Sequence, residues 1–199
     1  MKIAAAISSE INGLKRPVIS SYDLGKLLFS LYQAGNYKGT PFSSLRKELP
    51  TRRTYLSVVK ELSAYGVLRE GRLVSNSNAF EIFSSSSSAP SPGEIACCID
   101  PFAYVSHLSA MEYHGLTDQF PKMLFVSSPK SSVWSQLAKR QMEKDLGESL
   151  KDYLRTGLPI LKRLKMNKIA GKPVNIHSSV HYDMGAYVTV KDRLLRVSS

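Results

Sequence analysis

The sequence predicts an α+β protein, and three of its features carry that prediction. Apolar residues at helical spacing dominate residues 20–66, whereas short β-prone runs bounded by glycine follow between 67 and 83. Residues 84–93 are rich in serine and proline, have little apolar area to bury, and are predicted to form a linker. With 199 residues, the chain is long enough for two small domains. We therefore expect one domain at 1–83 and a mixed α/β domain at 94–199.

Three helices are predicted before the β-prone runs. The first has Ser20 or Ser21 as its N-cap, ends at Gly35, and is indicated by four leucines at the spacing of one helical face: Leu24, Leu27, Leu28 and Leu31. A short second helix is expected over 42–49. A longer third helix is expected over 51–66, where the first residue suits an N-cap and the last residue suits a C-terminal glycine.

The β-prone runs after the third helix suggest a hairpin. Gly71 lies between the runs 67–70 and 72–74, and a further strand is expected over 79–83. Helix, short helix, longer helix and hairpin is the element order of a winged helix-turn-helix. We therefore predict a winged helix-turn-helix DNA-binding domain over residues 1–83.

The third helix has two chemically different faces. At about 100° per residue, its apolar side chains gather on one face: Tyr55, Val58, Val59 and Leu62. The opposite face carries Arg53, Ser57 and Lys60, with Arg52 and Thr54 on its flanks. Arginine can form paired hydrogen bonds to guanine, and hydroxyl groups can contact bases or phosphates, so this face suits a DNA major groove. We predict that these five residues bind DNA, together with four residues near the second helix and in the hairpin: Ser43, Ser44, Arg69 and Arg72.

The charge of the chain also favours a polyanionic partner. Lys and Arg number 27 against 16 Asp and Glu, which gives a formal charge of +11. Residues 38–72 hold eight basic and three acidic side chains, and residues 155–172 hold six basic and no acidic ones. Both segments are candidates for phosphate contact. The sequence thus favours sequence-specific binding to double-stranded operator DNA with transcriptional repression. The alternative is a protein–protein interaction module that binds an acidic partner, with incidental DNA affinity.

The sequence contains no recognisable enzyme signature, so we expect no catalytic site, no metal site and no cofactor. His107 and His114 lie seven residues apart, and His177 and His181 lie four apart, but neither pair has further ligands at a spacing typical of zinc. Acidic residues cluster only within a predicted surface helix, whereas a nuclease needs carboxylates gathered around a divalent metal. An enzyme acting on nucleic acid is therefore the third alternative.

The cysteines and the N-terminus are typical of a cytoplasmic protein. Cys97 and Cys98 are adjacent, a spacing at which a disulfide is strained, and are expected to be buried free thiols. The first ten residues lack the roughly 7–15 apolar residues of a secretory signal. No apolar run approaches the ~18 residues that span a bilayer. We expect a cytoplasmic protein with no membrane partner and no small-molecule substrate.

The most distinctive run of the second half extends from Tyr104 to Gln119. Val105, Leu108 and Met111 recur at intervals of three, which predicts a helix ended by Gly115. A strand is expected over 122–127, stopped by Pro129.

This run resembles the AbiEi family of antitoxins and transcriptional regulators, from type IV toxin–antitoxin systems of bacteria. The most specific part of the resemblance is Ser109-Ala110-Met111-Glu112-Tyr113-His114-Gly115-Leu116, and Arg53-Thr54-Tyr55-Leu56 is similar to the family's winged-helix half. The resemblance implies an N-terminal winged helix that binds operator repeats and represses its own operon. It also implies a second domain that counteracts a cognate nucleotidyltransferase toxin. Because family members continue beyond the point that corresponds to Ser199, it implies that this antitoxin domain is truncated at its C-terminus.

Overall fold

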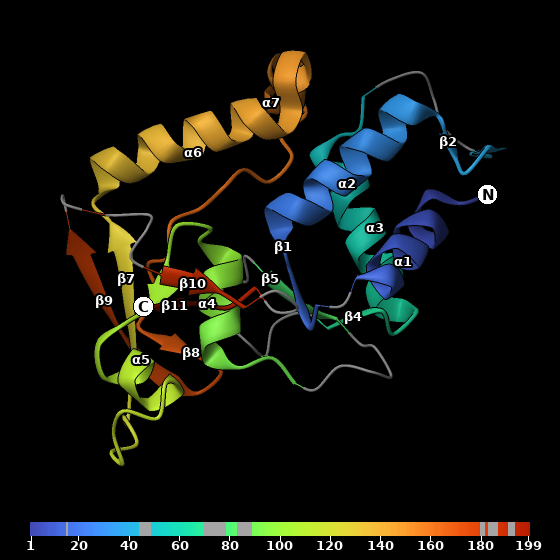
Figure 1. Ribbon diagram of the computed structural model, residues 1–199. Helices are drawn as coiled ribbons and strands as arrows, with labels where there is room; N and C mark the ends of the chain where they lie inside the picture. The colour runs from blue at the N-terminus through green and yellow to red at the C-terminus, as the bar shows by residue number, and fades with distance from the viewer. Residues whose placement is uncertain are drawn as a thin grey trace.

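Helices and strands are mixed along the whole chain in the computed structural model (Figure 1), in agreement with the predicted α+β class at this coarse level. The structure describes residues 1–14, 16–43, 49–69, 79–82, 89–179, 182, 187–190 and 194–199. The elements of the first part are α1 (Ile3–Gly13), β1 (Val18–Ser20), α2 (Ser21–Ala34), β2 (Asn36–Tyr37), β3 (Thr40–Pro41), α3 (Arg52–Ala64), β4 (Leu68–Arg69) and β5 (Ala79–Ile82).

Two of the predicted helices are confirmed together with their caps. Helix α2 begins after Ser20, whose side chain accepts a hydrogen bond from the backbone N–H of Asp23, and it ends at Gly35 in the left-handed conformation. Helix α3 begins after Thr51 with a capping box. At its other end, Gly66 has a φ of 69°, and Val67 N–H donates to the carbonyl of Leu62, which satisfies a terminal carbonyl of the helix.

Other predicted elements of this part differ or lie outside the described residues. Helix α1 was not predicted, although Ala4, Ile7 and Ile11 lie on one face and are buried. Of the short helix expected over 42–49, residues 44–48 lie outside the described residues, and so does the hairpin turn at Gly71.

The strands around α3 form a small antiparallel sheet in the order β1-β5-β4. Strand β5 is central, with Ile19 opposite Phe80 on one side and Leu68 opposite Ile82 on the other. Helix α1 packs against α2 and α3, and these helices bury their apolar faces in one cluster with β4 and β5. Among its described residues, the first part of the chain therefore has three helices packed beside a three-stranded sheet.

The second part is built around a larger mixed sheet in the order β10-β11-β6-β7-β9-β8. Its elements are α4 (Pro92–Ile99), β6 (Tyr104–Val105), α5 (His107–Tyr113), β7 (Leu124–Pro129), α6 (Ser131–Leu146), α7 (Leu150–Arg155), β8 (Lys168–Ile169), β9 (Lys172–Ser179), β10 (Tyr187–Thr189) and β11 (Arg196–Ser198). Strands β7 and β9 are parallel, and the chain crosses between them through α6 and α7. Helix α4 packs on the sheet, where its apolar residues form a second core with side chains of β6, β7 and β11.

Two details of the second part differ from expectation. Val105 belongs to β6, not to the helix, because its backbone pairs with Val126 of β7 and it lies beside Val197 of β11. The expected linker 84–93 is described from residue 89 onward, and there Ser91 caps α4 while Pro92 occupies its first turn. The two cysteines are free and buried, as predicted, and burial raises the pKa of both thiols.

A buried carboxylate joins several elements of the second part. Asp100, fully buried at the end of α4, accepts four hydrogen bonds. One oxygen accepts from Phe102 N–H (3.0 Å) and Trp134 Nε1 (2.9 Å), and the other from Ser128 Oγ (3.0 Å) and Leu164 N–H (3.1 Å). Since these donors come from β7, α6 and the segment after α7, one side chain fixes their mutual positions.

The two parts of the chain share one hydrophobic core. The cluster that contains the apolar faces of α2 and α3 also contains Trp134, Met142, Tyr153 and Leu158 from the second part. Helix α2 approaches α7 closely because Gly25 has no side chain there. A Cβ atom at Gly25 would lie 2.7 Å from the Tyr153 hydroxyl oxygen and 3.3 Å from Pro159 Cδ.

We expect Gly25→Ala to destabilise the protein, even though alanine is the better helix former by roughly 1 kcal/mol. The added methyl group must displace the buried Tyr153 ring or the chain at Pro159, an overpacking effect of about 1–3 kcal/mol. Urea denaturation measures the change. Gly13→Ala is the matched control, since no atom lies within 4 Å of its Cβ position. Equal midpoints for wild type and Gly25→Ala would contradict the close packing.

Candidate nucleic-acid interface

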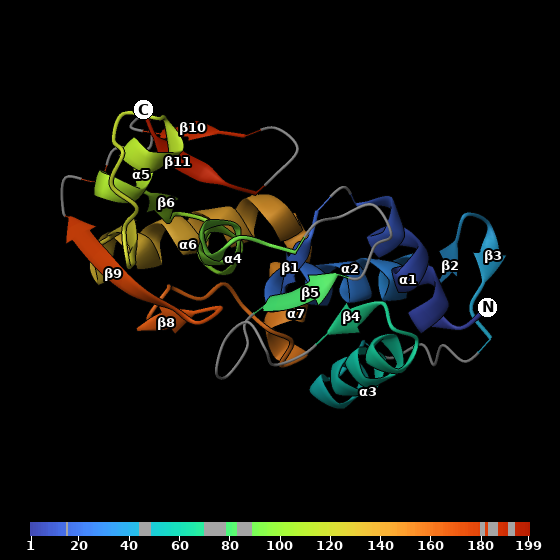
Figure 2. The same cartoon turned by 90° about the horizontal axis from the view of Figure 1, so that it is seen from below.

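Helix α3 lies at an edge of the molecule (Figure 2). The side chains of Tyr55, Val58, Val59 and Leu62 are buried, as the apolar spacing predicts. Arg52, Arg53, Ser57 and Lys60 are exposed. The division of the helix into an apolar inner face and a basic outer face is therefore confirmed, and DNA contact by that outer face remains a prediction.

Thr54 differs from the other candidates on α3 because its hydroxyl is engaged in the helix cap. It accepts from Thr51 N–H at 3.3 Å, its own N–H donates to Thr51 Oγ1 at 3.3 Å, and the two hydroxyl oxygens lie 3.1 Å apart. This capping box fixes the first turn of α3, which carries Arg52 and Arg53. Thr54 thus orients the basic residues beside it.

The remaining candidates lie on either side of α3 in the chain. Ser43 is exposed, and its hydroxyl donates to the carbonyl of Met1 at 3.4 Å. Arg69 is exposed on β4, opposite Glu81 in the β4–β5 register. Ser44 and Arg72 lie outside the described residues.

A cavity of about 330 Å³ lies directly beside α3, and the sequence did not reveal it. Arg52, Leu56 and Val59 of α3 line one side, and the segment 157–162 lines the other. Only the packing of the second part of the chain beside Leu56 makes this side of α3 a cavity wall. The nearest sequence signal is Leu56 itself, a large apolar residue that does not belong to the predicted buried face of the helix.

The second basic segment, Arg155 to Lys172, does not form one surface. Lys162 lies at the cavity beside α3, whereas Lys168 and Lys172 belong to β8 and β9 of the large sheet. Arg155 pairs with Asp152 at 3.4 Å, and Arg163 donates to Ser178 Oγ at 2.6 Å. Lys162 is the basic residue of this segment that lines the cavity together with Arg52.

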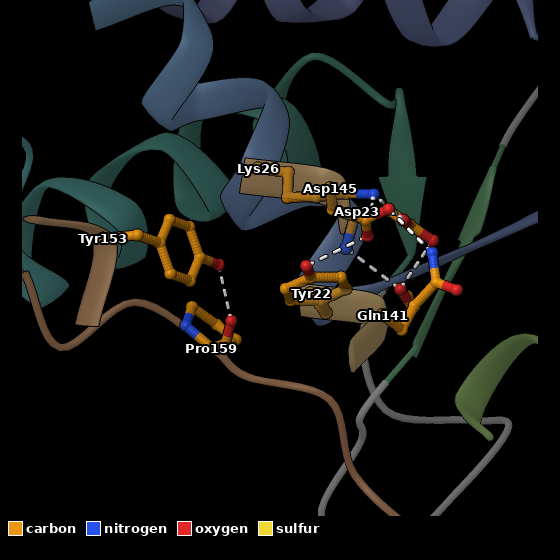
Figure 3. A network of polar contacts seen from close by, with 8 residues as sticks. Tyr22, Asp23, Lys26, Gln141, Asp145, Tyr153 and Pro159 are labelled. Carbon is orange, nitrogen blue, oxygen red and sulfur yellow. Dashed lines mark hydrogen bonds and ion pairs between the residues drawn. The ribbon is translucent and has the colours of Figure 1, made fainter. Parts of the chain in front are cut away.

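A charged network holds α2, and with it α3, against α6 (Figure 3). Asp145 accepts from Lys26 Nζ at 2.8 Å, from the Tyr22 hydroxyl at 3.0 Å and from Gln141 Nε2 at 2.7 Å. Burial alone would raise the pKa of Asp145, but the hydrogen bond and charge of Lys26, with the other two donors, lower it. Burial and the Asp145 charge raise the pKa of Tyr22, so its hydroxyl stays a donor.

This network predicts a pH-dependent contribution to stability. A carboxyl group whose pKa is lower in the folded chain stabilises the fold above its unfolded pKa of about 3.9. That contribution disappears as the pH falls through the folded value. We expect Asp145→Asn to cost about 2 kcal/mol at neutral pH, and the difference from wild type to vanish in strong acid. Urea denaturation across this pH range measures it. Asp152→Asn, at an exposed ion pair, should cost less than about 1 kcal/mol. A cost of Asp145→Asn that stayed constant down to acid pH would exclude this account.

A group of hydrogen-bonded polar side chains lies on the large sheet, near the start of α5. A hydrogen bond of 2.8 Å joins Ser106 Oγ and His107 Nδ1, and Ser127 Oγ donates to Ser106 Oγ at 2.9 Å. The ring centroids of His107 and His177 are 5.3 Å apart. The structure therefore brings together a histidine pair different from those considered in the sequence. His114 lies apart and contacts the Ser198 carbonyl at 2.7 Å.

Among the described residues, no group of three or more His, Cys, Asp or Glu side chains is arranged to hold a metal ion. None of the helices in the described part of the chain combines the length and apolar composition that crossing a membrane requires. No protein-family model matches the sequence, and no curated protein is significantly similar to it. The function is therefore inferred from the residues and their arrangement.

Proposed function

We propose that the protein is a sequence-specific DNA-binding repressor that reads the major groove with α3. One observation carries this proposal: the helix buries Tyr55 and Leu62 and exposes Arg53, Ser57 and Lys60 on one outward face. Long basic side chains reach base edges and phosphates, and the serine hydroxyl can bond to either.

The arrangement around α3 supports the same proposal. The chain order α1, β1, α2, α3, β4 and β5, with β2 and β3 between α2 and α3, and the sheet order β1-β5-β4 support a winged helix-turn-helix arrangement. Strand β4 packs against α3. Arg69, at the end of β4, is then near enough to the duplex to contact a phosphate of the backbone.

Substitutions on α3 separate base reading from phosphate contact. Arg53→Ala is expected to lose about 1–3 kcal/mol of discrimination between the correct duplex and a scrambled one. Lys60→Ala is expected to weaken binding to both duplexes alike and to reduce the slope of log affinity against log salt by about 0.9. Fluorescence anisotropy at raised salt measures both effects, with a duplex taken from the region upstream of the gene.

The matched control is Lys139→Ala, since this lysine is exposed on α6, away from α3. Its affinity and salt slope should equal those of wild type. If the double variant Arg53→Ala/Lys60→Ala bound the upstream duplex as tightly as wild type, the assignment of α3 would be refuted.

A second candidate function is the binding of a partner protein, and a specific surface favours it. Five large apolar side chains of α5 and the loop after it are exposed, including Phe120 at 83%: Met111, Tyr113, Leu116, Phe120 and Met123. Exposed apolar clusters of this kind are typical of protein-binding surfaces. Met111, Tyr113 and Leu116 lie in the run that resembles AbiEi antitoxins, and Phe120 and Met123 follow it. We propose that this apolar cluster serves to counteract a nucleotidyltransferase toxin.

This second candidate is tested by co-expression with the nucleotidyltransferase encoded next to the gene. The double variant Leu116→Asp/Phe120→Asp should lose protection against the toxin while it binds DNA as wild type does. Lys60→Ala should show the reverse behaviour. Leu154→Asp is the control, because Leu154 has similar exposure on α7 and lies outside the cluster. Full protection by the double variant would exclude this surface.

A further inference from the structure

We infer that the cavity between α3 and the segment 157–162 binds a small organic anion with an apolar body. This cavity shares Arg52 with the basic face of α3 but none of Arg53, Ser57 and Lys60, and it shares no residue with the apolar cluster after α5. Its volume of about 330 Å³ is within the range of small-molecule sites. The inference stands on the lining of the cavity, and its consequence for DNA binding rests on the proposed function.

The floor and walls of the cavity are largely apolar. Val59, Phe80, Ile99 and Leu158 line it from four different segments of the chain. Two further lining residues are unusually exposed for their type: Leu56 at 56% and Ile160 at 47%. Covering these two side chains with an apolar ligand would remove hydrophobic surface from water at roughly 25 cal/mol per Å².

The charges at the cavity have one sign. Arg52 lines it from α3 and Lys162 from the opposite segment, and no described lining residue is acidic. Neither cation forms an ion pair with a carboxylate in the part of the chain that the structure describes. The two tyrosine hydroxyls of the lining are already engaged, since Tyr22 donates to Asp145 and Tyr55 donates to the Ser21 carbonyl. Two cations beside an apolar floor complement a carboxylate, sulfonate or phosphate attached to an apolar body.

The same geometry couples the cavity to DNA binding. Arg52 is the first residue of α3 and one of the predicted DNA-binding residues of this helix. An anion bound between Arg52 and Lys162 would neutralise cations that otherwise face the duplex, and it would occupy space beside the recognition helix. The ligand should therefore weaken DNA binding and reduce its salt dependence.

The experiment uses the full chain and the fluorescent probe 8-anilinonaphthalene-1-sulfonate, an apolar body with one sulfonate. The probe should bind one equivalent with enhanced fluorescence. Ile160→Asp and Lys162→Glu should each raise its dissociation constant at least about tenfold. Both side chains are exposed, so both variants are expected to fold, and a thermal melt checks this. The neutral analogue N-phenyl-1-naphthylamine, which lacks the sulfonate, should bind about tenfold more weakly than the anionic probe.

Matched controls distinguish the cavity from other surfaces. Leu154 has an exposure similar to that of Ile160 but does not line the cavity, so Leu154→Asp is the control for Ile160→Asp. Lys165→Glu makes the same change of charge as Lys162→Glu three residues further along the chain, at a residue that does not line the cavity. Both controls should bind the probe as wild type does. Equal probe binding by all variants, or none by wild type, would overturn the site, and equal affinity for the neutral analogue would overturn the anionic class of ligand.

A second measurement tests the coupling separately. Saturating probe should weaken binding to the upstream duplex in wild type but not in Lys162→Glu. If the probe binds at the cavity and the affinity for DNA is unchanged, the site stands and its link to DNA binding is wrong. If the protein binds no duplex at all, the proposed function fails while the fluorescence result still decides the ligand site.

Discussion

The arrangement of the whole molecule depends on the buried carboxylate of Asp100. A carboxylate group is tolerated away from water only when its oxygens accept hydrogen bonds from the protein. Here two backbone N–H groups, an indole and a hydroxyl are the donors. The donors Trp134 and Leu164 lie near the two ends of the long connection through α6 and α7 that joins β7 to β9. Because both ends of this connection donate hydrogen bonds to Asp100, the connection has a defined position on the large sheet. The surface on which the first part of the chain docks is thereby fixed as well.

The docking of α2 on α6 and α7 then determines where α3 lies. Helix α2 contacts α6 through Lys26 and Asp145, and it contacts α7 through the close approach of Gly25 to Tyr153 (Figure 3). The Tyr153 hydroxyl also donates to the Pro159 carbonyl at 2.6 Å, which orders the segment that faces α3. Since α3 packs in the same core as α2, its position relative to that segment follows. The cavity beside α3 is therefore a consequence of docking between elements that lie more than a hundred residues apart.

The sequence predicted the parts of this fold that local chemistry determines. The caps Ser20 and Thr51 and the glycines at helix ends act on neighbouring residues, so the bounds of α2 and α3 could be inferred, and the basic outer face of α3 followed from its spacing. Val105 shows the limit of such reasoning, because its apolar spacing suited a helix while pairing with two distant strands made it part of a sheet. Gly25 shows another limit. A glycine within a predicted helix is compatible with many packings, and only Tyr153 explains it.

The position of the functional surfaces has a physical consequence for how the protein can respond to its partners. Helix α5, which carries Met111 and Tyr113 of the apolar cluster, lies in a different part of the molecule from α3 in both views (Figures 1 and 2). A partner on the first surface therefore has no direct steric conflict with a duplex on the second. The cavity beside α3 is different, since its two walls come from the two parts of the chain and Arg52 belongs to both the wall and the basic face. If α3 binds DNA as proposed, a group in the cavity would interact differently with the DNA-bound and free proteins, which is the condition for thermodynamic coupling between two ligands. Regulation of DNA affinity is thus expected from the cavity, and simultaneous binding of protein and DNA from the more distant surface.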